Sequence, residues 1–342
     1  MSRTRLAVIT DAWFPQINGV VRTLDTTIKH LGPDYKVEVF EPSMFPNYAL
    51  PGYNEIRLAN PKGLAKKLEL FDPQSIHIAT EGPLGWAALI WCLRNDKSFT
   101  TSYHTQFPEY LHKKLRVPTW LTYSVLRFFH SYSSTVMTNT PSMRERLKEK
   151  GFKRTRIWSR GVDTSLFNTT GPKDPTMSQL KGFVLLNVGR VSSEKNLEAF
   201  YELDLSSWPN LAGLPLYKVQ VGDGPQLESY KAKYPDVIFL GAKSGDELAA
   251  VYRSADVFVF PSKSDTFGLV MLESIASGVP IAAYPVVGPI DVVVEGSSGY
   301  LFDELSDAVM FCLEHDMSDS CVEAAKAFTW DACTRQFKDN LV

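Results

Sequence analysis

Short hydrophobic runs rich in β-branched residues recur along the chain, and each is followed by a stretch with hydrophobic positions at helical spacing. Strands that alternate with helices in this way are typical of parallel sheets covered by helices on both faces. We therefore predict an α/β protein with two sets of strands, at 5–10, 36–40, 75–79, 98–103, 134–139 and 155–159, and at 183–189, 217–222, 237–241, 256–261 and 280–285.

The chain has 342 residues, which is too many for one ordinary hydrophobic core and favours two domains. Residues 169–182 contain several turn formers and no hydrophobic period, so they are predicted to form a linker. The expected organisation is a doubly wound, Rossmann-like domain at 1–168, then the linker, then a second such domain at 183–327. We expect the two domains to face each other across a cleft.

The composition, with 44% hydrophobic and 22% charged residues, is that of an ordinary globular protein. The first hydrophobic run, Leu6 to Ile9, is too short for a secretory signal, and the most hydrophobic window, residues 82–93, is too short to span a bilayer. The four cysteines show no C-x-x-C spacing, which argues against a metal cluster or a disulfide framework. We expect a cytoplasmic protein.

Charge is unevenly distributed although the net charge is only −2. Residues 1–168 carry 23 Lys and Arg against 14 Asp and Glu, whereas residues 169–342 carry 13 against 24. A basic first half favours a partner that is anionic, but neutral drift of surface charge explains the asymmetry equally well.

Glycines and charged residues follow several of the predicted strands, where ligands bind in doubly wound sheets. His104 and Arg190 each come directly after a strand, and Gly222 lies in a GDGP turn after another. Gly19 lies at the start of a helix in FPQINGVVRTL, where it would approach a phosphate site if the domains close; the alternative is a plain turn glycine.

Two acids, Asp265 and Glu273, flank the segment TFGLVML. Eight residues of continuous helix rise about 12 Å, whereas the paired carboxylates of glycosidases lie roughly 5 to 9.5 Å apart. A shared acid–base role is therefore not expected. The spacing suits the two ends of a long polar ligand, with Asp265 just before the helix and Glu273 two turns inside it.

The backbone N–H groups of Thr266, Phe267, Gly268 and Leu269 would then lie at a helix N-terminus, which favours phosphate. A ligand with hydroxyl groups at each end and a diphosphate in the middle is a nucleoside-diphosphate sugar. From this pattern alone the alternative is equally good: one acid would be a helix cap and the other a solvated helix position.

Arg190 and Lys195 lie in NVGRVSSEKN, on the loop and first turn after a predicted strand. Two cations beside a helix start suit a diphosphate and can stabilise the charge that develops when it leaves. An isolated surface pair of cations would have no such role.

Together these segments resemble the retaining glycosyltransferases of family 4, which have the GT-B fold of two Rossmann-like domains. The acid-x7-acid motif of that family appears as Asp265 to Glu273, with Asp where the family usually has Glu. Its Arg/Lys pair matches Arg190 and Lys195, its glycine loop matches PQINGVVRTL at Gly19, and its histidine matches SYHTQFPEYL at His104.

The resemblance extends through both predicted domains, with one departure. The NGVD motif of the family reads RGVD here, from Arg160, so no role is carried over from its Asn. The family also implies that residues 328–342 form a last helix that packs back on the N-terminal domain. The segments AWFPQINGVVRTL, YHTQFPEYL, WSRGVD and VVGPIDVV are similar to those of GDP-mannose-dependent α-mannosyltransferases, although UDP-sugars remain an alternative donor.

The resemblance implies transfer of a hexose with retention of the α configuration, by front-face attack in which the departing diphosphate takes the proton of the acceptor. Arg190, Lys195 and the backbone at Gly19 and at Phe267-Gly268 would hold the diphosphate. His104 would bond the donor sugar. Asp265 is expected to bind the sugar hydroxyls and Glu273 the ribose. No D-x-D triplet occurs, so neither a metal nor a cofactor is expected.

The acceptor is expected to be a lipid or a glycan. A lipid-linked acceptor is favoured by basic and aromatic helical segments in the first half, which would suit contact with an anionic membrane surface. Those residues are Lys62, Lys66 and Lys67, and Lys113, Lys114, Arg116, Trp120, Tyr123, Phe128 and Phe129. Alternatively, the aromatic side chains pack on the sheet.

Other functions remain open from the sequence: a nucleotide-sugar epimerase, a phosphorylase, or a non-catalytic binder of sugar nucleotides. A nicotinamide dehydrogenase is disfavoured because the nearest stretch to its fingerprint, GDGPQL, lacks the third glycine.

Overall fold

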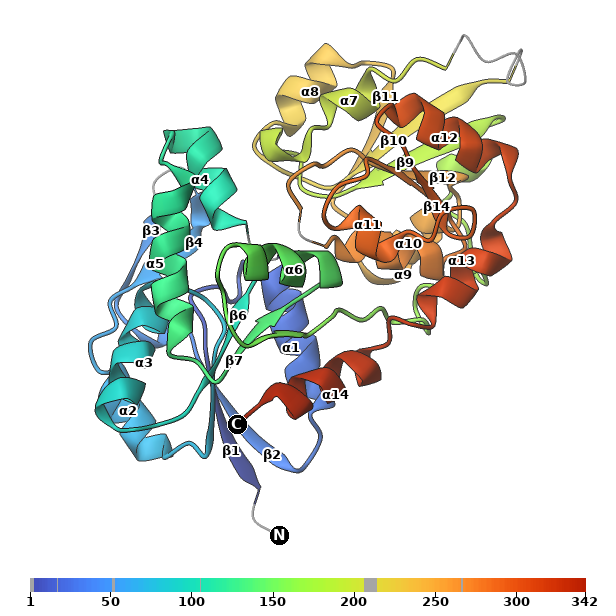
Figure 1. Ribbon diagram of the computed structural model, residues 1–342. Coiled ribbons are helices and arrows are strands. Elements are labelled where there is room, and N and C mark those ends of the chain that lie inside the picture. Colours follow the sequence, from blue (N-terminus) through green and yellow to red (C-terminus); the bar gives the residue numbers. More distant parts are fainter. Residues whose placement is uncertain (1–2, 17, 51–52, 105, 206–213, 266) are drawn as a thin grey trace. The chain divides into compact units, whose positions relative to one another are not determined.

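The computed structural model describes residues 3–16, 18–50, 53–104, 106–205, 214–265 and 267–342. The chain forms two compact units (Figure 1). Unit 1 consists of Met1–Arg160 together with Trp330–Val342, and unit 2 consists of Gly161–Thr329. Each unit contains a six-stranded parallel sheet, so the predicted pair of doubly wound α/β domains is confirmed.

Unit 1 contains one parallel sheet and one hairpin. Its strands are β1 (Thr4–Ile9), β2 (Tyr35–Phe40), β3 (Asn47–Leu50), β4 (Tyr53–Ala59), β5 (Ser75–Ile78), β6 (Thr100–Tyr103), β7 (Thr135–Thr138) and β8 (Thr155–Ile157). Its helices are α1 (Gly19–His30), the 3-10 turn η1 (Pro42–Met44), α2 (Leu64–Phe71), α3 (Pro83–Arg94), α4 (Phe107–Leu115), α5 (Thr119–Ser131), α6 (Pro141–Glu149) and α14 (Trp330–Asn340). The sheet order is β2-β1-β5-β6-β7-β8, and β3 and β4 form an antiparallel hairpin that was not predicted.

The sheet of unit 1 has a hydrophobic core on each face, because successive side chains of a strand point to opposite faces. In β1, Leu6 and Val8 pack in a cluster with residues of α1 and α14, whereas Ala7 and Ile9 pack in a cluster with residues of α2, α3 and α5. The strand is therefore a continuous apolar run, as expected for a sheet that is covered on both sides.

The last helix, α14, belongs to unit 1 although the preceding 169 residues of the chain form unit 2. Phe337 is buried with its ring 4.6 Å from that of Trp158, and the side-chain amide of Asn340 donates to the carbonyl of Ile157 at 2.8 Å. The expected return of the C-terminal helix to the N-terminal domain is therefore present.

Unit 2 contains β9 (Phe183–Val188), β10 (Leu216–Val221), β11 (Val237–Gly241), β12 (Val257–Phe260), β13 (Ile281–Ala283) and β14 (Gly299–Leu301). Its helices are η2 (Met177–Gln179), η3 (Ser193–Lys195), α7 (Glu198–Tyr201), α8 (Leu227–Lys233), α9 (Gly245–Tyr252), α10 (Leu269–Ala276), α11 (Pro289–Val292), α12 (Leu305–Glu314) and α13 (Ser318–Ala325). The order is β11-β10-β9-β12-β13-β14, and the edge strand β14 was not predicted.

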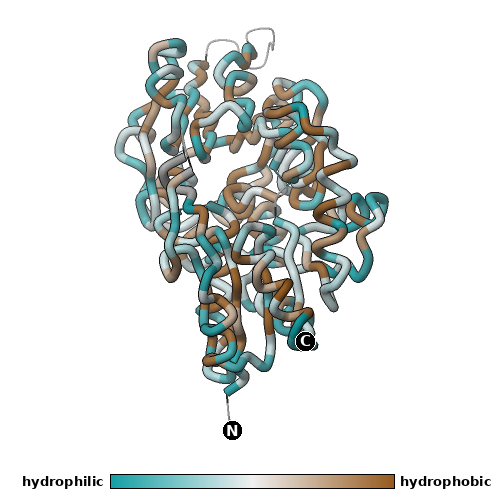
Figure 2. Tube along the Cα trace, turned by 90° about the vertical axis from the view of Figure 1, so that its left-hand side faces the viewer, coloured by the Kyte–Doolittle hydropathy of each residue, from teal (hydrophilic) through white to brown (hydrophobic). Residues whose placement is uncertain are grey.

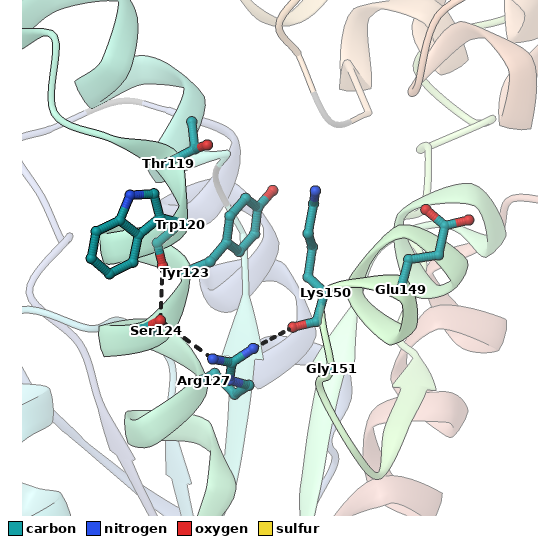
Figure 3. Close-up of a pocket in the computed structure, with 8 residues that line it drawn as sticks. All are labelled: Thr119, Trp120, Tyr123, Ser124, Arg127, Glu149, Lys150 and Gly151. Atoms are coloured by element: carbon teal, nitrogen blue, oxygen red, sulfur yellow. Dashed lines mark hydrogen bonds between the residues drawn. The ribbon is translucent and has the colours of Figure 1, made fainter.

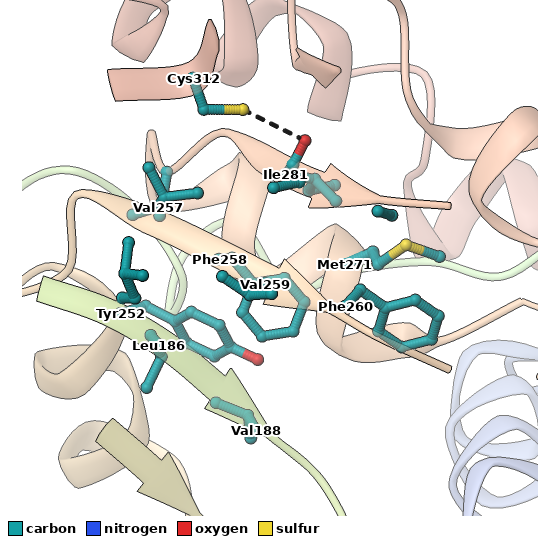
Figure 4. Close-up of a cluster of buried hydrophobic side chains, with 14 of the residues drawn as sticks. Leu186, Val188, Tyr252, Val257, Phe258, Val259, Phe260, Met271, Ile281 and Cys312 are labelled. Atoms are coloured by element: carbon teal, nitrogen blue, oxygen red, sulfur yellow. Dashed lines mark hydrogen bonds between the residues drawn. The ribbon is translucent and has the colours of Figure 1, made fainter. Parts of the chain in front are cut away.

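The core of unit 2 is one large cluster, part of which is shown in Figure 4. Phe258 of β12 is fully buried beside Leu186 of β9 and Tyr252 of α9. Residues 161–182 pack on this unit, because Phe167 and Met177 are buried in the same cluster. The stretch 169–182, which lacks a hydrophobic period, is therefore anchored at Met177.

The strand order places one switch point in each sheet, and such points are where doubly wound sheets bind ligands. In unit 1 the switch point lies between β1 and β5, and in unit 2 between β9 and β12. Hydrophobic stretches along the chain are short and alternate with hydrophilic ones (Figure 2), and within the described residues no helix is both long and apolar enough to cross a bilayer.

Candidate active site

At the switch point of unit 2, three hydrogen bonds between described residues join the loops that follow β9 and β12. Lys195 Nζ donates to Asp265 Oδ1 at 2.6 Å, and both side chains are about a quarter exposed. The side-chain amide of Asn196 donates to the carbonyl of Pro261 at 3.0 Å, and Ser264 Oγ donates to the carbonyl of Glu194 at 3.1 Å. Two residues that the sequence singled out 70 positions apart are thus in direct contact.

The helix after Asp265 starts later than expected. Gly268 is the N-cap of α10, with φ of 89°, and a Cβ there would lie 3.0 Å from the ring of Phe260. A left-handed residue cannot continue a helix, so α10 begins at Leu269 and Glu273 lies little more than one turn inside it. The prediction of two turns is therefore wrong. Thr266, one of the predicted N–H donors, lies outside the described residues.

Neither alternative reading of the two acids holds. Asp265 is not the N-cap of α10, because Gly268 occupies that position and Asp265 pairs with Lys195. Glu273 is only 4% exposed, and its Oε2 accepts from Tyr252 Oη at 3.0 Å. A buried carboxylate needs hydrogen-bond donors, so Glu273 is held in a fixed orientation by α9.

Phe267 and Leu269 differ in how they could serve a ligand. The Phe267 side chain is buried, with its ring 6.2 Å from that of Phe328, so it fixes the segment to the core of unit 2. Leu269 is half-buried at the first position of α10. The expected contribution of Phe267, Gly268 and Leu269 through backbone groups therefore remains a prediction.

Arg190 is exposed on the loop after β9, and Gly222 packs directly against this loop. A Cβ on Gly222 would lie 1.9 Å from the carbonyl oxygen of Gly189, and the N–H of Val191 donates to the carbonyl of Asp223 at 2.9 Å. Only a glycine permits this close approach of two backbones. The structural role of Gly222 is thus to seat the loop that carries Arg190.

In unit 1, Gly19 is the first residue of α1, which is capped by Asn18. The Asn18 side chain accepts from the N–H groups of Val20 and Val21 at 2.9 and 3.0 Å. A Cβ on Gly19 would meet no atom within 4 Å among the described residues, and the φ of Gly19 is not positive. Neither the backbone nor the described neighbours therefore demand a glycine at this position.

His104, directly after β6, is buried and bonded to an arginine. Arg160 Nη2 contacts His104 Nδ1 at 2.9 Å, and the ring of Trp158 lies 5.7 Å from that of His104. Burial, and then the charge of Arg160, lowers the pKa of His104 well below its ordinary value. His104 is therefore neutral at physiological pH.

Two more buried histidines lie on neighbouring elements of unit 1. His77 bonds the hydroxyls of Thr100 and Ser102, each at 2.9 Å, and burial lowers its pKa to about 3. His130 lies 2.8 Å from the hydroxyl of Thr101 and 3.1 Å from a carboxylate oxygen of Glu81. The sequence did not indicate this arrangement.

The structure thus brings Lys195 and Asp265 together in unit 2 and places Gly19 and His104 in unit 1. The sequence missed Arg160 as the partner of His104; its only signal was the departure from the NGVD motif. Within the part of the chain that is described, no three His, Cys, Asp or Glu side chains form a group that could hold a metal ion.

Family comparisons define the class of protein. A family described as "Glycosyltransferase Family 4" matches residues 17–166, and one described as "Glycosyl transferases group 1" matches residues 173–326. Both describe glycosyltransferases. Together the two matches extend over most of both units, and the chain belongs to the family 4 glycosyltransferases.

The curated relatives are named for different sugars. A GDP-mannose-dependent alpha-mannosyltransferase of Corynebacterium glutamicum is 27% identical, over 97% of this chain and 87% of the relative. An alpha-monoglucosyldiacylglycerol synthase of Streptococcus pneumoniae is 29% identical, over 94% and 78%. A sulfoquinovosyl transferase of Arabidopsis thaliana is 28% identical over 86% of this chain, which spans 61% of that relative. The chain is a glycosyltransferase.

Solved structures agree with the fold. Sucrose-phosphate synthase from Thermosynechococcus elongatus has a TM-score of 0.76 at 20% identity, over 98% of each chain. Anabaena HepE, in complex with UDP and glucose, has a TM-score of 0.72 at 17% identity, over 98% of this chain and 99% of that one. These likenesses confirm the GT-B fold.

Proposed function

We propose that this enzyme transfers mannose from GDP-mannose to a hydroxyl group of a lipid or glycan acceptor, with retention of configuration and without a metal. The observation that carries the proposal is the contact of Lys195 with Asp265 at the β9/β12 switch point, beside the loop of Arg190. This edge combines cations for a diphosphate with a carboxylate for sugar hydroxyls.

The geometry of unit 2 supports a role for each group. Because Lys195 and Asp265 are about a quarter exposed, their ion pair can rearrange, and the ammonium can turn to a diphosphate while the carboxylate accepts from sugar hydroxyls. Arg190, which is exposed on the loop after β9, adds the second cation. Glu273, fixed by Tyr252, is suited to accept from the ribose hydroxyls.

Unit 1 supplies the remaining groups of the proposal. Gly19 opens α1 with space around its Cα, which suits a backbone that approaches a phosphate. His104 would bond the donor sugar and orient the acceptor. Because the chain offers no identified nucleophile to the anomeric carbon, the proposed chemistry is front-face attack, with catalysis by position and electrostatics.

The names of three curated relatives favour GDP-mannose as the donor. The C. glutamicum relative is named for GDP-mannose, as are relatives from Mycobacterium tuberculosis and Mycolicibacterium smegmatis at 26% and 27% identity. UDP-glucose is the second candidate donor, because the S. pneumoniae relative is named for a glucosyl product and HepE was solved in complex with UDP and glucose.

An exposed face of α5 supports a lipid-linked acceptor at an anionic membrane. Leu121, Val125, Phe128 and Tyr132, which we call the α5 seam, recur at helical spacing and are 44% to 55% exposed. Trp120 beside them is 69% exposed. The predicted packing of aromatics on the sheet holds for Tyr123 and Phe129, which are buried.

Polar and basic groups border the α5 seam. A pocket of about 350 Å³ beside Trp120 is lined by Arg127 and Lys150 among others (Figure 3). Arg127 Nη1 donates to the carbonyl of Lys150 at 3.0 Å, and Arg116 nearby in the chain is exposed. The side chains of Lys113 and Lys114 lie outside the described residues. Exposed apolar side chains with basic side chains near them suit an anionic bilayer.

A donor panel tests the reaction. The purified protein is incubated with GDP-mannose, GDP-glucose or UDP-glucose and a diacylglycerol or glycan acceptor, and the α-linked product is measured. We expect product from GDP-mannose, and we expect GDP to raise the melting temperature more than UDP; a ligand at 100 times its Kd adds about 2.7 kcal/mol. Product from UDP-glucose alone would move the proposal to its second candidate. Donor binding without any product would contradict it.

Vesicle flotation tests the membrane surface. The protein should float with phosphatidylglycerol vesicles and not with phosphatidylcholine vesicles, and salt should weaken the binding because exposed charges are screened. Phe128→Ser and Trp120→Ser should each weaken binding several-fold. Leu214→Ser, which replaces a 54% exposed leucine of unit 2, is the matched control. Binding that ignores both salt and these substitutions would rule the surface out.

A further inference from the structure

Arg160 is a buried cation. Its described hydrogen bonds are with the side chain of His104 and with backbone carbonyls. It is 6% exposed, and its Nη1 donates to the carbonyls of Trp158 and Ser159 at 2.9 and 3.1 Å. Its guanidinium also lies 5.2 Å from the centre of the Trp158 ring. Burying a cation is expensive unless its donors are satisfied, so the position of this guanidinium is strongly specified.

The contact with His104 determines where the imidazole carries its proton. A guanidinium has only donors and stays protonated in proteins. In the 2.9 Å contact between Arg160 Nη2 and His104 Nδ1, the imidazole nitrogen must therefore be the acceptor. A neutral imidazole with an unprotonated Nδ1 carries its hydrogen on Nε2.

We propose that Arg160 is a positioning residue that holds His104 as the neutral Nε2–H tautomer, so that His104 serves the donor sugar as a hydrogen-bond donor and never as an acid or base. The inference rests on the proposed function for the role of His104 and adds what sets its protonation. It assigns a task to the position at which the chain departs from its family.

The other titratable groups around His104 do not oppose this state. His77 is buried between two hydroxyls, His130 is bonded to Thr101 and Glu81, and Cys333 lies near Arg160 with its thiol donating to the carbonyl of Ser159 at 3.1 Å. Burial, the charge of Arg160 and the two histidines all lower the pKa of His104. The pKa of Arg160 itself falls only to about 10, so it remains a cation.

The tautomer can be read directly by NMR of the intact protein labelled with ¹⁵N-histidine, with the His104 signals assigned by their loss in His104→Asn. In the wild type we expect a pyridine-type Nδ1 and a pyrrole-type Nε2 that do not titrate between about pH 5.5 and 8. A protonated Nδ1 in the wild type would overturn the inference. This measurement needs neither donor nor turnover.

Substitutions of Arg160 test the cause. Arg160→Met removes the donor and the charge, so both tautomers should appear and the pKa of His104 should rise. The pH profile of kcat/KM should then gain an acid limb that falls about tenfold per pH unit. Arg160→Lys keeps the cation and should keep the wild-type profile. Arg154→Gln, which removes a cation bonded to the Ser131 carbonyl in the same unit, should change neither signal.

The results separate a failed inference from a failed function. If Arg160→Met folds and shows the wild-type tautomer and pH profile, Arg160 is only structural and the inference is wrong, whatever the donor is. If Arg160→Met does not fold, the wild-type NMR spectrum and Arg160→Lys still decide the question. If the NMR expectations hold but no glycosyl transfer occurs with any donor, the inference about Arg160 stands and the proposed reaction fails.

Discussion

The two units share one architecture and differ in how they hold charge at the carboxyl edge of the sheet. In unit 2, Lys195 and Asp265 form an ion pair in which each side chain is about a quarter exposed. In unit 1, His104 and Arg160 are buried and bonded to each other at 2.9 Å, and His77 is buried within β5, where it bonds the hydroxyls of Thr100 and Ser102. The same parallel sheet thus supports two kinds of polar edge.

The difference has a physical consequence for function. Charges that are partly exposed can exchange partners at little cost, which suits the binding and release of a diphosphate. Buried groups have a fixed protonation state and a fixed direction, which suits the orientation of a sugar. The comparison predicts that substitutions of the charged residues of unit 2 weaken the stabilisation of the leaving diphosphate. Changes of pH should act mainly on the stability of unit 1.

The largest effect is expected from removing the cations of unit 2. Arg190→Ala and Lys195→Ala should each lower kcat by about 10² to 10³, because each cation stabilises the charge that develops on the leaving diphosphate. Stability should change by less than about 1 kcal/mol, since Lys195 pairs with Asp265 near the surface. Turnover and thermal unfolding, measured on the same samples, separate the two effects.

Lys243→Ala is the matched control for these variants. Lys243 is 25% exposed, lies in the same unit on the loop between β11 and α9, and pairs with Glu247 at 3.7 Å. Its loss should leave kcat unchanged. Equal turnover in the Arg190 and Lys195 variants and the wild type would show that the exposed charges of unit 2 have no catalytic role.

A smaller effect, on binding, is expected from Glu273→Gln. The amide keeps the shape and can still accept from Tyr252, but it loses a charged acceptor for the ribose, worth about 1.5–3 kcal/mol. The KM for the donor should rise about 10- to 100-fold with little change in kcat, because the ribose contact is the same in the ground and transition states.

A nucleotide without ribose hydroxyls makes this test specific. By isothermal calorimetry, 2′,3′-dideoxy-GDP should bind the wild type and Glu273→Gln equally, whereas GDP should bind the variant more weakly. A similar loss for both nucleotides would mean that Glu273 supports only the packing of α10 on Tyr252.

Much of the fold could be predicted because the hydrophobic pattern that indicates each strand or helix lies within a few neighbouring residues of the chain. Every strand predicted from the sequence is present, and strands such as β1 and β12 are apolar runs because they are buried on both faces. The hairpin of β3 and β4 escaped because its residues are mixed in polarity, with Tyr48 70% exposed. The strand β14 escaped because it begins with a glycine directly after the turn-forming residues Gly296, Ser297 and Ser298, which favour a loop.

The sequence predicted which residues the candidate site contains, but not which of them contact one another. Lys195 and Asp265 were both singled out, but their ion pair joins positions 70 residues apart, which no local period encodes. The burial of Arg160 could not be read from the sequence, since arginine is mostly exposed. The partner of Glu273, Tyr252, is on another helix, so its hydroxyl could be found only in three dimensions.

Mild acid should lower the free energy of unfolding of unit 1 more than that of unit 2. The pKa of His77 is about 3 in the folded protein and near 6.5 when unfolded, so the unfolded chain binds more protons between these values. The stability due to neutral His77 is complete above about pH 6.5 and is lost as the pH falls. The loss reaches about 2 kcal/mol at pH 5 for one such histidine.

Hydrogen exchange at pH 7 and pH 5, followed by mass spectrometry, checks this expectation. Peptides from β5 and β6 should lose protection at pH 5 more than peptides from β9 and β12, because residues 161–329 contain one histidine, His315, and it is exposed. His77→Gln, whose amide can both donate and accept, should reduce the difference. Equal loss of protection in both units would contradict the contrast between buried and exposed polar edges.

The smallest effect is expected from chelation of metals. With Arg190 and Lys195 available to neutralise the leaving diphosphate, EDTA should leave kcat and the donor KM unchanged, and added Mn²⁺ or Mg²⁺ should not increase them. The Lys195→Ala variant sharpens the test, because it lacks one positive charge at the diphosphate. A divalent ion bound to the nucleotide can partly replace that charge. We therefore expect Mg²⁺ to stimulate this variant and not the wild type. Loss of wild-type turnover in EDTA, restored by Mn²⁺, would mean that the exposed cations of unit 2 are insufficient for catalysis.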